Sequence, residues 1–414
     1  MKATNIQPVP VSAIPVTSGH FWLLALAALA GAGSAQADDL LTLKLSTSLV
    51  HDNNLFRFPS GNASALIDRP DGREQMLIIK ADAALRFSHS LQALDIDLQQ
   101  VSSRHSNFAY LDNTAYSYWA TWRWSYSPRI HGTLSSSRQE TSDAFTGEQD
   151  FTKLNQQTIS TNKFSATYEV DGNWRVLGGA SHVSEKSQQQ QVGQSDYTAN
   201  QAQLGLGYAF ASGSTASYMI RQVNGNYQNK RLPSAELIDD RFKQQDHELR
   251  VSWSIDGKTT AQLMAMYVQR RHPHYPQRDY QGMNGTADIH LQLTGKTAFT
   301  LGLARELASY QTANANFSQV DRVTLGSVWS LTPKMQARAR YELGRWNYKG
   351  SPAVTAPTPT ARQDTTHDAV LSLEWQPYTF VVFTVALQKS MRSSNLPNLD
   401  YDSDMVNLTA QFTY

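Results

Sequence analysis

Apolar and polar residues alternate over most of this chain, with the period expected of strands that have one apolar face. The last ten residues show it most clearly, because every second side chain from Val406 to Tyr414 is apolar. Side chains of a strand point alternately to its two faces, so this segment predicts one apolar face and one polar face. Such a strand either meets lipid or is half buried in a soluble sandwich, and the rest of the chain decides between them.

The same alternation recurs along the chain and predicts an all-β fold of about 18 strands. We interpret these segments as one transmembrane, antiparallel outer-membrane β-barrel. The strands are expected at 40–51, 73–88, 91–104, 112–127, 129–141, 155–170, 173–186, 195–210, 214–227, 241–255, 258–271, 280–293, 296–310, 317–331, 334–347, 364–376, 379–391 and 402–414.

Short turns and longer loops alternate between these strands. Turn signals such as Asp171-Gly172-Asn173 recur at intervals of about 40 residues, which is also the period of a β-propeller blade. A blade needs four strands in that length, whereas each interval here contains two long strands and one polar loop. Short periplasmic turns and longer external loops are typical of outer-membrane barrels, and an even strand number places both mature ends in the periplasm. The long connections are expected at 52–72, 142–154, 228–240 and 348–363.

Aromatic residues mark both ends of the expected apolar faces. In segment 116–126, polar residues Ser117, Thr121, Arg123 and Ser125 share one face, and the other carries Tyr116, Tyr118, Ala120, Trp122, Trp124 and Tyr126. Aromatic girdles at the two membrane interfaces have this arrangement. A soluble sandwich would turn the apolar face to its core, but the girdles, the terminal aromatic residue and an export signal favour the membrane barrel.

The export signal lies at the start of the chain. Residues 21–33 form a short apolar run, and Ser34-Ala35-Gln36-Ala37 matches a signal-peptidase cleavage pattern. The run is too short to anchor the chain in a bilayer. We therefore expect a signal peptide over 1–37 and one transmembrane β-barrel domain over 38–414. Lys2 is the only cation before the run, so translation could also begin downstream of Met1.

Composition excludes several other classes. The mature part contains no run of about 18 apolar residues, which excludes a helical membrane protein. The chain has 36 Lys plus Arg against 35 Asp plus Glu and no cysteine, so it needs no disulfide to fold outside the cytoplasm. This balance gives no basis for a nucleic-acid partner. We also expect no cofactor.

Charged residues alternate with the apolar ones and are expected to point inward. A barrel of about 16 to 18 strands is too wide for side chains to fill and leaves an aqueous lumen. Because the inward charges are mixed in sign, weak charge selectivity is expected. Cross-strand ion pairs that only brace the wall are the alternative for each of them. The candidate pore-lining residues are Lys80, Asp82, Arg86, Asp95, Asp97, Arg123, Glu248, Arg250, Arg338, Arg340 and Glu342.

A short motif follows the first expected strand. Its residues are Asp52, Asn53, Asn54, Leu55, Phe56 and Arg57. The motif resembles the start of EpsL-type outer-membrane proteins of exopolysaccharide biosynthesis loci. That resemblance implies a β-barrel of the porin group that moves an exopolysaccharide chain across the outer membrane, and it implies no catalytic residues. From the residues alone, Phe56 either packs in the loop or narrows the lumen.

The chain end also resembles the closing strand of bacterial outer-membrane barrels. In those proteins the C-terminal aromatic residue is read by the barrel-assembly machinery, and here Phe412 and Tyr414 would provide that signal. The partners expected from these resemblances are the exopolysaccharide, outer-membrane lipid and lipopolysaccharide, the assembly machinery and periplasmic export proteins. The expected location is the outer membrane of a Gram-negative bacterium.

Two further groups give weak signals. His272 and His274 could ligate a metal, but they lack further ligand spacing and are better interpreted as a solvated loop tip. The run from Asp400 to Asp404 alternates carboxylates but lacks the glycine and distal glutamate of a calcium loop, so we interpret it as a polar loop. No local nucleophile motif is present. We predict no metal site.

These observations favour a passive or gated conduit for an exopolysaccharide, without a chemical step of its own. A general or sugar-selective diffusion porin is the first alternative. An outer-membrane barrel enzyme is the second, and a lumen of about 8 to 12 strands would favour it.

Overall fold

The computed structural model describes residues 40–59, 72–142, 153–188, 196–228, 239–274, 276–309, 317–349 and 361–414. The expected signal peptide lies outside the described residues, as do most residues of the four long connections. Within the described part, no helix has the length and apolarity needed to cross a membrane.

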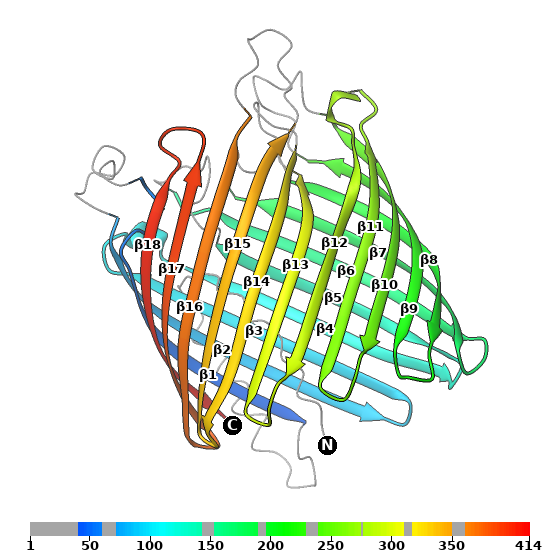
Figure 1. The fold of residues 1–414 in the computed structure, drawn as a ribbon, viewed down its shortest axis with the longest axis horizontal. Helices are drawn as coiled ribbons and strands as arrows, with labels where there is room; N and C mark the ends of the chain where they lie inside the picture. Colours follow the sequence, from blue (N-terminus) through cyan, green and yellow to red (C-terminus); the bar gives the residue numbers. More distant parts are fainter. Residues whose placement is uncertain are drawn as a thin grey trace.

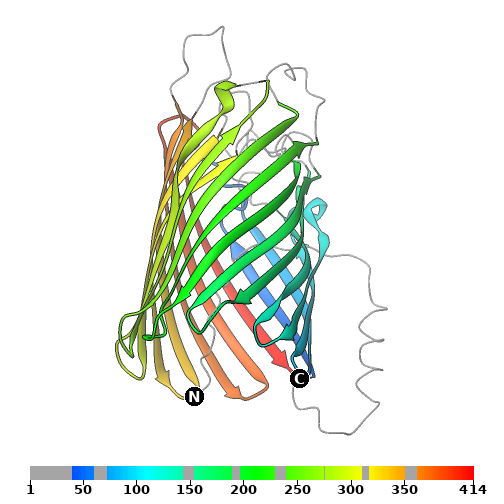
Figure 2. The same cartoon turned by 90° about the vertical axis from the view of Figure 1, so that its right-hand side faces the viewer.

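Eighteen antiparallel strands form one sheet that closes on itself (Figures 1 and 2). Each strand pairs with its neighbours in sequence, and β1 pairs with β18 to close the barrel. The fold class is therefore confirmed, and every expected strand end lies within about three residues of the observed one. The strands are β1 Leu41–Asp52, β2 Glu74–His89, β3 Gln92–His105, β4 Asn113–Ser127, β5 Ile130–Ser142, β6 Gln156–Glu169, β7 Trp174–Ser187, β8 Tyr197–Ala209, β9 Thr215–Tyr227, β10 Arg241–Ser254, β11 Thr259–Arg271, β12 Tyr280–Gln292, β13 Thr297–Ser309, β14 Phe317–Thr332, β15 Met335–Lys349, β16 Gln363–Tyr378, β17 Val381–Ser394 and β18 Tyr401–Thr413.

The register brings the apolar residues of neighbouring strands together on the outer face. Leu49 of β1, for example, pairs with Leu77 of β2 on one side and with Leu408 of β18 on the other. Large aliphatic side chains on this face keep much of their surface exposed, 65 % at Leu204 for example. A continuous apolar surface of this extent is stable only against lipid. We call this surface the apolar belt.

The two ends of the barrel differ in their connections. β1 begins and β18 finishes at the same end, where the backbone N–H of Leu43 donates to the carbonyl of Tyr414 over 2.8 Å. The turns at that end are short, and Gly213 in the β8–β9 turn has a φ of +80°, which glycine adopts without strain. The longer connections, two of which contain the 3-10 turns η1 (Ala109–Leu111) and η4 (Pro276–Arg278), lie at the opposite end. The short-turn end is the periplasmic end, and the opposite end is the outer end.

Two buried apolar clusters lie at the outer end. In the first, Phe56 and Phe58 of the β1–β2 connection pack against Phe108 and Leu111 of the β3–β4 connection. The Phe56 and Phe108 rings meet edge to face, with centroids 4.7 Å apart. The second cluster joins the outer ends of β8, β9 and β10 through Ala199, Val223, Tyr227 and Phe242. These clusters fix loops and strand ends on the inner side of the outer rim.

Candidate functional site: the charged inner face

The inner face is defined by the residues that alternate with the apolar belt. All 11 sequence-predicted pore-lining residues lie on this face, because each alternates along its strand with belt residues and pairs across the sheet with other inward residues. Whether they line an open pore stays a prediction. The structure joins them in three groups with additional charged residues.

The first group lies on β2, β3 and β4. The guanidinium of Arg86 lies 2.5 Å from Asp97 and 3.6 Å from Asp95, and Arg123 also pairs with Asp95. Further from the periplasmic end, Lys80 lies 3.3 Å from Asp82. Gln99 donates to the same carboxylate over 3.0 Å. Six predicted residues therefore form two separate sets of pairs, one with Arg86 and Arg123 and one with Lys80.

The second group lies on β9 and β10 and is the most deeply buried. Glu248 pairs with Arg221 over 2.9 Å and with Arg250, while Asp246 lies 3.5 Å from Arg221. Only 2 % of each of the two acidic side chains is exposed. Gln244 donates to Asp246 over 2.8 Å. Both carboxylates are thus paired with side chains of the wall itself, and the Arg250 guanidinium extends from the wall into the barrel interior.

The third group forms a ladder across β13 to β16. Arg322 lies 3.1 Å from Glu342 and 3.4 Å from Glu306. Arg340 lies 2.9 Å from Asp368 and 3.5 Å from the same Glu342. At the periplasmic side of this ladder, Arg338 pairs with Glu374 over 3.3 Å. Charges of opposite sign therefore alternate along and across this part of the wall.

The heads of the inward arginines remain partly exposed. Arg123 and Arg250 each keep 56 % of the side chain exposed, and Arg86 keeps 43 %. An inner face packed into a solid core would bury these groups. The exposed guanidinium groups show that the barrel interior has space beside its wall, as expected for this strand number. The arrangement presents fixed donors and acceptors of both charge signs along the wall.

The predicted first-loop motif lies at the outer end of β1, on the inner side. Asp52 accepts hydrogen bonds from Arg57 over 2.8 Å, from the Ser403 hydroxyl over 2.9 Å and from the backbone N–H of Asn54 over 2.8 Å. Arg57 has a φ of 56°, a left-handed conformation that this ion pair helps to hold. Asp52 therefore ties the loop to β18.

The asparagines extend this bracing. Asn54 donates to the carbonyls of Phe58 and Asp402, and Asn53 donates to the Asp404 side chain. Leu55 packs at the edge of the cluster that contains Phe56, whose side chain is 1 % exposed. Of the two interpretations of Phe56, the structure shows the packing contact. A further role of this loop in narrowing the lumen stays a prediction.

Several residues of the site were missed from the sequence. Asp246 and Asp368 share the strand parity of Glu248 and Glu374, so strict alternation would have found them. Glu74 gave no such signal, because its role depends on a distant loop. It is fully buried and accepts hydrogen bonds from the backbone N–H groups of Ser106, Asn107 and Phe108 over 2.9 to 3.0 Å.

The interpretation of both loop histidines as a solvated tip was wrong for His272. Its side chain is buried beside Tyr227 and Phe242, and burial lowers its pKa to about 4. These two aromatic residues come from strands distant in sequence, which is why the loop alone was misleading. His274 is exposed and lies 3.1 Å from Asp239 and 3.7 Å from Asp240. Although burial opposes ionisation of Asp239, hydrogen bonds from His274 and Arg241 lower its pKa to about 2.

Asp402 and Asp404 lie in β18, which confirms the expected strand 402–414 for them and contradicts the polar-loop interpretation of the run 400–404. They lie at the start of β18, and both carboxylates pair with Lys389 of β17. Phe412 is half exposed in the belt, and Tyr414, at the chain terminus, is 84 % exposed. A role of these aromatic residues in assembly stays a prediction.

No family model matches the chain, and no curated protein matches its sequence. Among solved structures, the fold is similar to Pseudomonas aeruginosa OccK2 (OpdF) in complex with glucuronate, with a TM-score of 0.52 and 12 % identity over 90 % of this chain and 98 % of that chain. It is also similar to Pseudomonas aeruginosa OccK9 (OpdG), with a TM-score of 0.50 and 12 % identity over the same shares. This likeness concerns the fold. Together with the apolar belt, it identifies an outer-membrane barrel of the Gram-negative type.

Proposed function

We propose that this protein is a diffusion channel of the outer membrane for small polar solutes, including sugars. The observation that carries the proposal is the half-exposed state of inward arginines in a barrel of 18 strands. Such an interior holds water beside a wall of charged and amide groups. These groups can exchange hydrogen bonds with passing hydroxyl and carboxylate groups without trapping them.

The solute class is proposed from the same chemistry. OccK2, which shares the fold, was determined with glucuronate, a sugar that carries a carboxylate. The wall of the present barrel offers both Arg heads and carboxylates, so we expect neutral and weakly charged sugars to pass, with little preference between cations and anions. The strand number also argues against the barrel-enzyme alternative, which a narrower lumen would favour.

Ion conductance in planar bilayers tests the proposal. The wild-type protein is expected to conduct with a reversal potential near zero in a salt gradient. The double variant Arg338→Glu/Arg340→Glu should shift the reversal potential toward cation selectivity, because both side chains lie on the inner face. Arg345→Glu is the matched control, since Arg345 lies on the same strand but on the outer face.

Uptake of neutral sugars by vesicles that contain the protein gives an independent readout. The swelling rate should fall with increasing sugar size. Equal shifts of reversal potential in the double variant and in Arg345→Glu would contradict the assignment of the inner face. Absence of both conductance and sugar uptake from folded barrels would contradict the channel.

Export of an exopolysaccharide is the second candidate, and the first-loop motif favours it through its EpsL-type resemblance. Under this proposal the loop braced by Asp52, Asn54 and Arg57 holds the outer rim open for a glycan chain. Gene deletion should then lower released exopolysaccharide and leave polymer in the cell. Phe56→Ala and Arg57→Ala should lower release while folded barrel remains. Normal release of exopolysaccharide from the deletion strain, combined with poor growth on small sugars, would reject the export function and favour the diffusion channel.

A further inference from the structure

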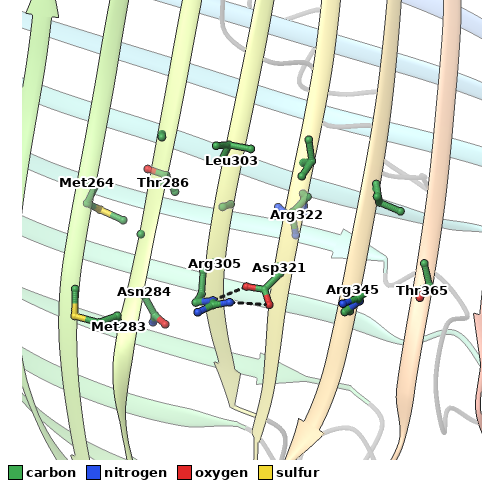
Figure 3. A pocket seen from close by; sticks show the side chains of 15 residues that line it. Met264, Met283, Asn284, Thr286, Leu303, Arg305, Asp321, Arg322, Arg345 and Thr365 are labelled. Atoms are coloured by element: carbon green, nitrogen blue, oxygen red, sulfur yellow. Dashed lines mark hydrogen bonds and ion pairs between the residues drawn. The ribbon is translucent and has the colours of Figure 1, made fainter.

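The barrel wall contains a depression at the outer-end edge of the apolar belt, across β11 to β16 (Figure 3). Most of its lining residues belong to the outer face by strand parity, whereas Met264, Asn284, Thr286, Ala304 and Arg322 belong to the inner face. Its volume is 660 Å³. One row of directly paired residues crosses it from strand to strand. The row consists of Gly285, Arg305, Asp321, Arg345 and Thr365.

The next outward row toward the membrane centre is apolar from β12 to β15 and ends at His367 on β16. Leu303, Val323 and Leu343 are direct cross-strand neighbours in it. All three side chains line the same depression and belong to the exposed belt. At one side of the depression Ala287 carries only a methyl group, and at Gly285 a Cβ would lie 2.6 Å from the carbonyl oxygen of Met264, so the wall there is mostly backbone. The depression thus joins a charged half toward the outer end of the barrel to an apolar half toward the membrane centre.

The charged row carries one more cation than anion. Arg305 donates two hydrogen bonds to the Asp321 carboxylate, of 2.5 Å from Nε and 3.1 Å from Nη2 (Figure 3). Arg345, on the other side of Asp321, is exposed and makes no hydrogen bond or ion pair within the described part of the chain. An arginine at the edge of a hydrocarbon layer is stabilised by an anionic headgroup.

The periplasmic and outer edges of the apolar belt also differ in the charge of their outward residues. In the described strands, the outward residues near the periplasmic ends include Trp253, Trp329 and Trp375 but no Lys or Arg. Near the outer ends the outward positions carry both signs of charge: cations such as Lys186, Lys243 and Arg271, and carboxylates such as Glu140, Asp402 and Asp404. In these strands the apolar belt therefore ends without Lys or Arg on the periplasmic side and against charged residues, cations among them, on the outer side.

From this arrangement we propose that the depression binds a phosphorylated glycolipid of the outer leaflet, lipopolysaccharide. Arg345 contacts a headgroup phosphate, Arg305 is held in position by Asp321 at the edge of the same site, and Leu303, Val323 and Leu343 contact an acyl chain. A guanidinium can donate two parallel hydrogen bonds to a phosphate, which gives the contact its geometry. The proposal does not depend on what passes through the barrel.

Retention of purified lipopolysaccharide by the folded, detergent-solubilised protein tests this site. Arg345→Glu should lower retention by roughly fivefold or more, since one surface cation contributes on that scale and the variant adds repulsion. Arg345→Gln should show a smaller loss, and Arg345→Lys should retain most of the binding. Arg340→Glu, on the inner face of the same strand, is the control and should leave retention unchanged.

Two ligand controls separate the chemical sources. Lipopolysaccharide without its phosphates should bind wild type and Arg345→Glu equally weakly. Inorganic phosphate at millimolar concentration should not displace the intact glycolipid if the acyl contacts contribute. Unchanged retention in folded Arg345→Glu and Arg345→Gln, or equal retention of the dephosphorylated glycolipid by wild type, would overturn the proposal. Full displacement by inorganic phosphate would overturn the acyl contact and hence the lipid site.

Discussion

The two faces of each strand differ in charge: the inner face carries paired charged side chains, and the middle of the outer face is apolar. On β15, Arg338, Arg340 and Glu342 point inward near the middle of the wall and all meet partners of opposite charge. Between them, Ala339 and Tyr341 point outward into the apolar belt, and the outer face carries no charge on this strand until Arg345. Neighbouring positions therefore meet different media, water inside and hydrocarbon outside. Strand parity alone decides which medium a side chain meets.

The largest effect is expected from a charge placed in the middle of the belt. Leu325→Arg on β14 should destabilise the barrel by about 2 to 4 kcal/mol, because the outer face there meets hydrocarbon. Thr324→Arg, one residue away, points inward beside Glu342 and should be nearly neutral. Urea unfolding in lipid vesicles measures both. Similar losses for the two variants would contradict the assignment of faces.

A smaller effect is expected from the buried ion pairs of the inner face. Glu248→Ala removes the carboxylate shared by Arg221 and Arg250 and should cost about 2 kcal/mol, because Arg221 stays largely buried. Glu374→Ala is the control, since its pair with Arg338 is partly exposed and should contribute less than about 1 kcal/mol. The same unfolding assay compares them. Equal losses of unfolding free energy for the two variants would mean that both ion pairs are solvated to the same extent.

The smallest effect concerns His272 at the outer rim, where Tyr227 and Phe242 shield its imidazole from water. Because burial lowers its pKa from 6.5 to about 4, the unfolded chain binds a proton there more readily than the folded chain between these values. Stability should therefore fall as the pH falls, by about 1 kcal/mol between pH 7 and pH 5.5. His272→Phe should remove this part of the pH dependence. Proton titration of the imidazole by NMR gives the pKa directly, and a value near 6.5 would contradict burial.

The strands and their two faces could be predicted because the alternation of apolar and polar residues is visible within a single stretch of sequence. The alternation around Leu94–Leu98 and Tyr116–Tyr126 already assigned inward and outward residues correctly. The ion-pair partners could not be predicted, since Arg340 meets Asp368 only through the register of β15 with β16. The outer-rim clusters and the outer-wall depression depend on contacts between separate loops and on rows across five strands. For the same reason, the aromatic environment of His272 was not visible in its own loop.

The seam between β1 and β18 has a consequence for how the chain reaches this state. Ser48 and Thr409, which share a hydrogen bond of 2.7 Å across the seam, are separated by 361 positions in sequence. The contacts that close the barrel are thus the most distant in sequence of the whole fold. The chain must lose the conformational entropy of bringing its two ends together before these contacts can stabilise it. Until then both terminal strands are open sheet edges, able to pair with other chains. Folding should therefore be slow and prone to aggregation unless a helper protein covers these edges until the last strand, ending at Tyr414, arrives.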